Sequence, residues 1–106
     1  VEMFASRPGA IAVACQGPSL AMPGALTTIQ VAVHGYAAAF NLSAMGHEEV
    51  SDTMGDLGAL LLDASRTKVF FGCGACVRTL GLRFGLRVHG IFDLQVADVV
   101  LRNANK

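Results

Sequence analysis

The sequence is poor in charge. Charged residues make up 15% of its 106 residues, whereas an ordinary soluble domain carries about 25%. No Asp, Glu, Lys or Arg occurs between Arg7 and Glu48. The eight Lys and Arg balance the eight Asp and Glu, so the net charge is not that of a typical nucleic-acid-binding protein, which is basic. Any affinity for phosphates must therefore come from a local patch.

The long uncharged stretch does not fit a membrane span, because polar residues and prolines interrupt it. These are Gln16, Pro18, Pro23, Gln30, His34 and Asn41. A spanning helix needs about 20 consecutive, predominantly apolar residues. We interpret the stretch as buried strands, and we expect neither a membrane nor a small-molecule substrate among the partners.

Cysteine is scarce and its count is odd. Three cysteines without a framework spacing argue against a secreted disulfide scaffold and favour a reducing compartment. We therefore expect reduced packing cysteines and an intracellular protein of the cytoplasm or an organelle matrix. Two alternatives remain open. Cys73 and Cys76 form a C-x-x-C motif typical of redox sites, although a downstream Pro is lacking, and Cys15 with these thiols and His34 could bind zinc.

The hydrophobic periodicity changes along the chain and predicts eight elements. We expect strands at 10–15, 26–33, 36–42, 67–72 and 88–92, a turn at 18–24, and helices at 48–64, from about 77 to Gly85, and from a cap at Asp93 through Leu101. The last helix should pack by an inner face of Val96, Ala97, Val100 and Leu101. The order β-β-β-α-β-α-β-α predicts an α/β fold with a mixed sheet, that of the ribonuclease H-like class, in a single domain over residues 1–106.

Several motifs in this order resemble DEDD-type 3′-5′ exonuclease domains. Phe84-Gly85 and the run 92–97, Phe-Asp-Leu-Gln-Val-Ala, are similar to a helix end and a helix start of that family, with Leu94 in place of Thr. The run 10–17 is similar to its first strand, Val-Asp-Cys-Glu-Gly, and Ile-Gln-Val-Ala at 29–32 to its second. The closest likeness is to the Egalitarian-like and exonuclease-domain-containing branch related to ribonuclease D.

The resemblance implies a two-metal nuclease site whose ligands are missing. Two divalent ions about 4 Å apart need several carboxylates, and hard cations prefer anionic oxygen ligands. The family's ligand positions fall on Ala14, Gln16 and Cys76, and its last ligand lies beyond Lys106. We therefore expect no catalytic residue, no metal and no cofactor, in a domain that is incomplete at its C-terminus.

These observations predict a pseudoenzyme that serves as a structural or interaction subunit of a larger complex, such as a ribonucleoprotein. One sheet face, lined by residues such as Val13 or Phe70, should be left open for other protein subunits to cover. An alternative is a domain that binds single-stranded RNA without cutting it. The candidate phosphate-binding residues are Arg66, Lys68, Arg78, Arg83 and Arg87, which have no acid among them.

Overall fold

The chain folds as a mixed sheet with helices, in the predicted order. The computed structural model describes residue 4, residues 6–17 and residues 26–104; the turn predicted at 18–24 and the end of the chain at Lys106 lie outside them. The elements are β1 (Ile11–Gln16), β2 (Thr28–Val33), β3 (Tyr36–Asn41), a short 3-10 helix η1 (Leu42–Ala44), α2 (His47–Leu62), β4 (Lys68–Phe70), α3 (Cys73–Phe84), β5 (Ile91–Asp93) and α4 (Leu94–Ala104). Apart from η1, this is the expected order β-β-β-α-β-α-β-α.

The five strands lie in the order β3-β2-β1-β4-β5. β1, β2 and β3 form an antiparallel meander, and β4 and β5 join it in parallel, as the sequence predicted. The last strand, however, begins at Ile91 rather than at Val88. The segment before this strand contacts the C-terminal end of α2, where the His89 backbone N–H donates a hydrogen bond to the Leu61 carbonyl at 2.9 Å. Gly90, at φ +70°, then turns the chain onto the sheet.

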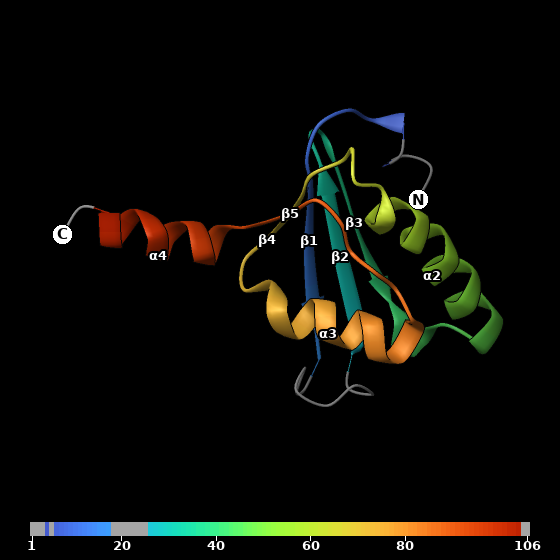
Figure 1. Ribbon diagram of the computed structural model, residues 1–106. Coiled ribbons are helices and arrows are strands. Elements are labelled where there is room, and N and C mark those ends of the chain that lie inside the picture. The colour runs from blue at the N-terminus through green and yellow to red at the C-terminus, as the bar shows by residue number, and fades with distance from the viewer. Residues whose placement is uncertain (1–3, 5, 18–25, 105–106) are drawn as a thin grey trace.

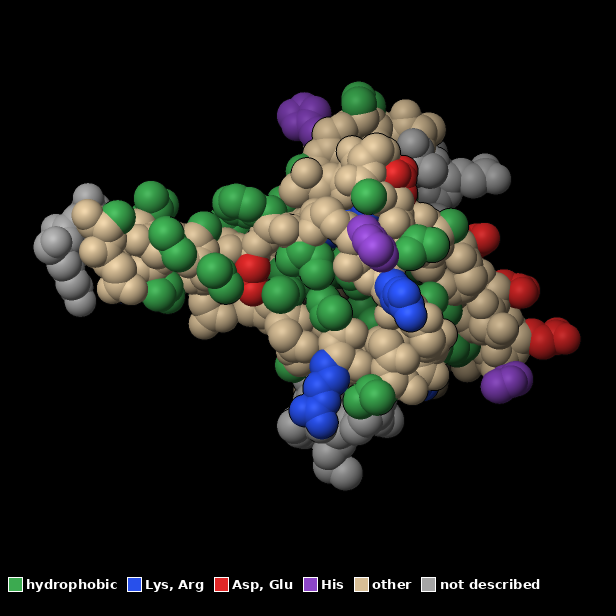
Figure 2. Space-filling model, in the orientation of Figure 1, with side chains coloured by type: hydrophobic (Ala, Val, Ile, Leu, Met, Phe, Trp, Pro, Cys, Tyr) green, Lys and Arg blue, Asp and Glu red, His purple; other side chains and the backbone are tan. Residues whose placement is uncertain are grey.

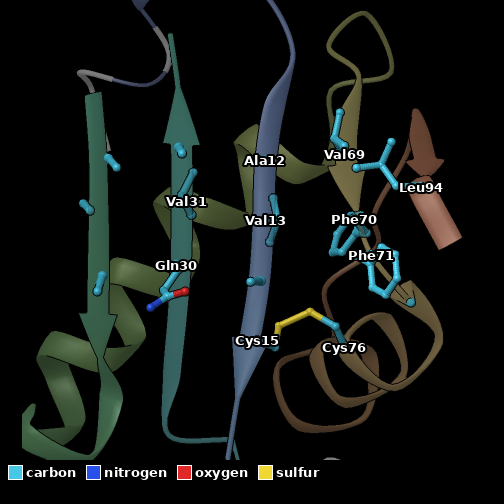
Figure 3. Close-up of a pocket in the computed structure, with 16 residues that line it drawn as sticks. Ala12, Val13, Cys15, Gln30, Val31, Val69, Phe70, Phe71, Cys76 and Leu94 are labelled. Atoms are coloured by element: carbon cyan, nitrogen blue, oxygen red, sulfur yellow. A yellow bond between two sulfur atoms is a disulfide. The ribbon is translucent and has the colours of Figure 1, made fainter. Parts of the chain in front are cut away.

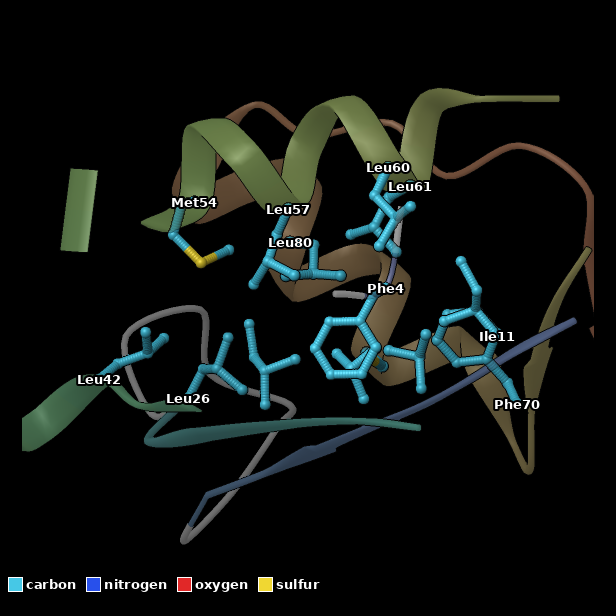
Figure 4. Packing of buried hydrophobic residues seen from close by; sticks show 14 of the residues in the cluster. Phe4, Ile11, Leu26, Leu42, Met54, Leu57, Leu60, Leu61, Phe70 and Leu80 are labelled. Atoms are coloured by element: carbon cyan, nitrogen blue, oxygen red, sulfur yellow. The ribbon is translucent and has the colours of Figure 1, made fainter. Parts of the chain in front are cut away.

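The hydrophobic core lies on one face of the sheet, beneath α2 and α3 (Figures 1 and 4). Alternate strand residues such as Ile11 and Ile29 face Leu57 and Leu61 of α2 and Leu80 of α3, and all of these are at most 2% exposed. Full burial of such a side chain contributes roughly 1.5–3 kcal/mol. Both amphipathic helices, α2 and α3, therefore pack against the same face of the sheet.

No helix among the described residues covers the opposite face, which we call the open face. Strand register places one row of side chains across it from Ala37 through Ala32, Ala12 and Val69 to Phe92. A second row runs from Ala39 through Gln30 to Ala14. The expected lining needs one correction, because Val13 and Phe70 belong mainly to the core and only border the open face from beneath. Val13 and Phe70 are 4% and 3% exposed because they point into the core.

Helix α4 extends away from the rest of the molecule (Figure 1). None of its side chains is buried. The predicted inner face is therefore apolar but unpacked: Val100 is 59% and Leu101 65% exposed. Among the helices that the structure describes, none has both the length and the apolar character to cross a bilayer.

Candidate functional site

A groove of about 670 Å³ occupies the open face, between the strands and the junction of β4, α3 and α4 (Figure 3). It is lined by Ala12, Val13, Ala14, Cys15, Gln30, Val31, Ala32, Ala37, Ala38, Ala39, Val69, Phe70, Phe71, Gly72, Cys76 and Leu94. None of these residues is charged. The groove is therefore an apolar surface with one amide side chain, that of Gln30.

The two ligand positions expected on β1 lie on the open face. Ala14 and Gln16 are two residues apart on one strand, so their side chains point to the same side, and both are exposed. Ala14 lines the groove opposite Gln30 of β2. Gln16 is the last residue of β1. The strand thus presents a methyl group and a neutral amide where the resemblance places two carboxylates.

The third expected position, Cys76, is joined to β1 by a disulfide. Cys15 and Cys76 are bonded, with their Cα atoms 5.5 Å apart, and Figure 3 shows the bond beside the groove. The prediction of reduced packing cysteines was therefore wrong for these two. A C-x-x-C disulfide between Cys73 and Cys76 is also excluded in this state, because the Cys76 sulfur is already bonded.

The remaining cysteine, Cys73, is free and partly buried. Burial, and then the neighbouring Asp93 carboxylate, raise the pKa of its thiol, so the reactive thiolate is disfavoured. The zinc alternative is not formed either. Cys15 and Cys76 are bonded to each other, His34 follows the opposite end of β2 from the Cys15 pair, and the described residues hold no group of three His, Cys, Asp or Glu arranged to bind a metal.

Asp93 organises the helix starts beside the groove. Its carboxylate accepts a hydrogen bond from the backbone N–H of Gln95 at 2.9 Å, which confirms the predicted cap of the last helix. It also accepts hydrogen bonds from the backbone N–H groups of Gly72 at 2.9 Å and Cys73 at 2.8 Å, at the start of α3. These hydrogen bonds, of which the one from the Cys73 backbone has the largest effect, hold the pKa of Asp93 well below its usual range. The sequence did not indicate the bonds to α3, because the partners are about twenty residues apart.

The candidate phosphate-binding residues differ in burial and in their contacts. Lys68 is wrong as an RNA-binding candidate: it is fully buried, its ammonium group donates to the Asp63 carbonyl, and burial lowers its pKa. Arg66 donates to the carbonyls of Gly9 and Phe4.

Three arginines remain near α3. Arg83 donates to the Leu26 carbonyl at 2.7 Å and lies over the Phe84 ring, so it is held by its own chain. Arg78 and Arg87 are exposed. Phe71, an aromatic residue that the sequence gave no reason to single out, lies beside the groove and is 72% exposed.

The most informative comparisons are with solved nuclease structures. A nuclease in its apo form superposes with a TM-score of 0.77 at 23% identity, over 98% of this chain and 49% of the other. Ribonuclease D from Trypanosoma brucei, in complex with GMP, gives 0.74 at 21% identity, over 88% and 29%. The EXD2 exonuclease domain soaked in Mn and GMP gives 0.67 at 27% identity, over 89% and 47%.

The chain has the fold of a DEDD-type 3′-5′ exonuclease domain. It spans about half or less of each of these nuclease chains. No protein-family model matches the sequence, and no curated protein matches it significantly. The assignment of the fold therefore rests on the structural similarity and on the motifs described above.

We predict that the protein, isolated without reductant, has one free thiol, that of Cys73. Replacing Cys15 with Ser should lower the free energy of unfolding by roughly 4 kcal/mol, because the bond closes a loop over a sequence separation of 61 and restricts the unfolded chain. Urea unfolding and thiol titration measure the two quantities. Cys73→Ser is the matched control, and we expect it to change stability much less. Two or more free thiols in the native protein would contradict the assignment.

Asp93 should also make stability depend on pH. Its folded-state pKa lies below the ordinary value of 3.8, so its contribution is present above about pH 4 and is lost as pH falls below that value. Asp93→Asn should lower the melting temperature at neutral pH and flatten its acid dependence. Asp98→Asn, which removes only the exposed 3.1 Å ion pair with Arg102, should have little effect. Equal effects of the two variants would contradict the capping role.

Proposed function

We propose that this chain is a catalytically inactive exonuclease-like domain that acts as a structural or interaction subunit of a larger assembly. The observation that carries the proposal is the replacement of the expected metal ligands. Ala14 has no donor, Gln16 is neutral, and the Cys76 sulfur is bonded to Cys15. Two-metal cleavage needs anionic oxygens that hold both ions, and these three positions offer none.

The exposed surface supports the interaction role. A groove without charge, beside the large exposed side chains of Phe71, Phe92 and Leu94, is the kind of apolar patch that marks a protein interface. The neighbours include a ribonuclease D solved with RNA. An assembly that contains RNA is accordingly the setting that we favour, with other protein subunits on the open face.

The first test is nuclease activity. We expect no metal-dependent trimming of a labelled single-stranded RNA in Mg²⁺ or Mn²⁺. The double variant Ala14→Asp with Gln16→Glu should bind Mn²⁺ at least about tenfold more tightly than the native protein, because two carboxylates then share one face of β1. The pair Ala37→Asp with Ala39→Glu places the same groups on β3 and serves as the control. Calorimetry measures binding. Metal-dependent trimming by the native chain, abolished by Gln16→Ala, would overturn the proposal.

A second candidate function is the binding of single-stranded RNA without cleavage. It is favoured by the exposed ring of Phe71 beside an open groove, since bases stack on such rings, and by the exposed guanidinium groups of Arg78 and Arg87. Because Arg83 is held by the Leu26 carbonyl, the arginines near α3 that remain for phosphates are Arg78 and Arg87, and we expect weak affinity at physiological salt.

In this candidate, Arg78→Gln should weaken RNA binding and reduce the slope of log affinity against log salt by about one. Fluorescence anisotropy with a labelled oligonucleotide measures both. Arg102→Gln removes an equal charge from the exposed end of α4 and should change neither. If the native protein binds no RNA at low salt, this candidate is excluded and the interaction role is unaffected.

A further inference from the structure

The three cysteines of the chain meet at the start of α3. Cys73 is the first residue of this helix and Cys76 the fourth, while Cys15 lies on β1 and is bonded to Cys76. Figure 3 shows the bond crossing from β1 to α3 beside the groove, and both bonded residues line the groove. The thiol of Cys73 is free. The proposed functions do not use these cysteines as reactive groups.

Cys76 has a second candidate partner within its own helix. Residues three apart in an α-helix lie on the same side of it, and the rise and radius of the helix place their Cα atoms about 5 Å apart. Disulfides join residues whose Cα atoms are about 4.4–6.8 Å apart. The spacing of Cys73 and Cys76 therefore meets the same requirement as the 5.5 Å between Cys15 and Cys76. C-x-x-C pairs of this kind form disulfides in thiol oxidoreductases.

We propose that the three cysteines form a thiol–disulfide exchange site, in which Cys76 is bonded alternately to Cys15 and to Cys73. The Cys73 thiolate attacks the sulfur of Cys76, a new S–S bond forms between these two residues, and the bond to Cys15 breaks. The electron pair of the broken bond stays on the Cys15 sulfur, which takes up the proton that Cys73 lost. The chain keeps one disulfide and one thiol throughout, so no external oxidant or reductant takes part.

The surroundings of Cys73 favour the pairing that the structure shows. Its backbone N–H donates to the Asp93 carboxylate at 2.8 Å, and burial, followed by a hydrogen bond to the same carboxylate, raises the pKa of its thiol. In Figure 2 most Asp and Glu side chains in view lie along α2, at the right, away from the start of α3 that Figure 1 shows. Asp93 is therefore the carboxylate that acts on Cys73. Because these contacts stabilise the free Cys73 thiol, the pairing of Cys76 with Cys73 is the minor state.

The two pairings hold the start of α3 in different ways. The bond to Cys15 fastens the first turn of α3 to β1, across a sequence separation of 61. The bond to Cys73 lies within one turn of α3, and it frees the thiol of Cys15, which is partly exposed and lines the groove. Exchange therefore releases α3 from β1 and places a thiol in the groove. The inference does not depend on the proposed loss of the metal ligands.

Three single variants test whether Cys76 is the shared partner. Each folded variant is treated with oxidised glutathione, a soluble disulfide that accepts the two electrons, and its unpaired cysteines are counted by mass spectrometry. A cysteine that carries glutathione counts as unpaired. Cys15→Ser and Cys73→Ser should each have none, because Cys76 pairs with the remaining cysteine. Cys76→Ser is the control and should have two. Two unpaired cysteines in Cys15→Ser, or an internal bond in Cys76→Ser, would overturn the proposal.

Exchange in the native chain is measured by trapping. The chain is incubated without reductant, acidified to stop exchange, labelled in denaturant with N-ethylmaleimide and digested with trypsin. Cys73 and Cys76 share the tryptic fragment 69–78. Cys15 lies in a fragment that ends at Arg66. We expect about 1–10% of the label on the Cys15 fragment, the population range of a minor state, and an equal share of 69–78 fragments with an internal bond.

Cys73→Ser is the matched control for trapping, because it keeps the bond of the structure but has no thiol to exchange. Its Cys15 fragment should carry no label. Label confined to the fragment 69–78 of the native chain at every incubation time would overturn the proposal. So would equal labelling of Cys15 in the native chain and in the control, since the bond would then be lost by another route. Nuclease and metal-binding assays report separately on the proposed loss of activity.

Discussion

One carboxylate holds the outer half of the fold together. Asp93 accepts hydrogen bonds from the backbone N–H groups of Gly72, Cys73 and Gln95, and so connects the end of β5 to the starts of α3 and α4. The first turn of a helix leaves amides without intrahelical partners, and a negative charge placed there is favourable. The depressed pKa of Asp93 reflects the same bonds. This junction therefore positions the starts of α3 and α4 beside the groove.

The sheet is one-sided for a reason that is visible in its side chains. β-branched and larger residues such as Val13 and Val31 alternate with Ala12, Ala14 and Ala32. The large set fills the space under α2 and α3, and the small set lies on the open face. In a two-metal nuclease, carboxylates on such a face draw cations. At the positions that the resemblance assigns to ligands on β1, Ala14 and Gln16 carry a methyl group and a neutral amide, which are poor ligands for a divalent cation.

The order of elements, the mixed sheet and the Asp93 cap could be predicted, because they depend on local periodicity and on one capping residue. The side of the sheet to which Val13 points could not be predicted, because a strand that is apolar throughout does not show which alternate residues point inward. The size difference between Ala and Val was the available signal. The Cys15–Cys76 bond joins residues 61 apart, and no local pattern indicates it. Lys68 illustrates a further limit, because a sequence shows charge but not burial.

The two proposed properties of the open face, weak metal binding and contact with another protein, have one physical basis. A carboxylate at position 14 would lie in the groove, and a helix docked there would remove it from water. Burying an unpaired charge is costly, so a groove that binds metal ions and a groove that holds an apolar helix require opposite side chains at the same place. The alanine rows satisfy the second requirement and not the first. Under the proposed function, an alanine at position 14 in place of the carboxylate that the resemblance implies therefore removes an obstacle to covering the open face with another protein surface.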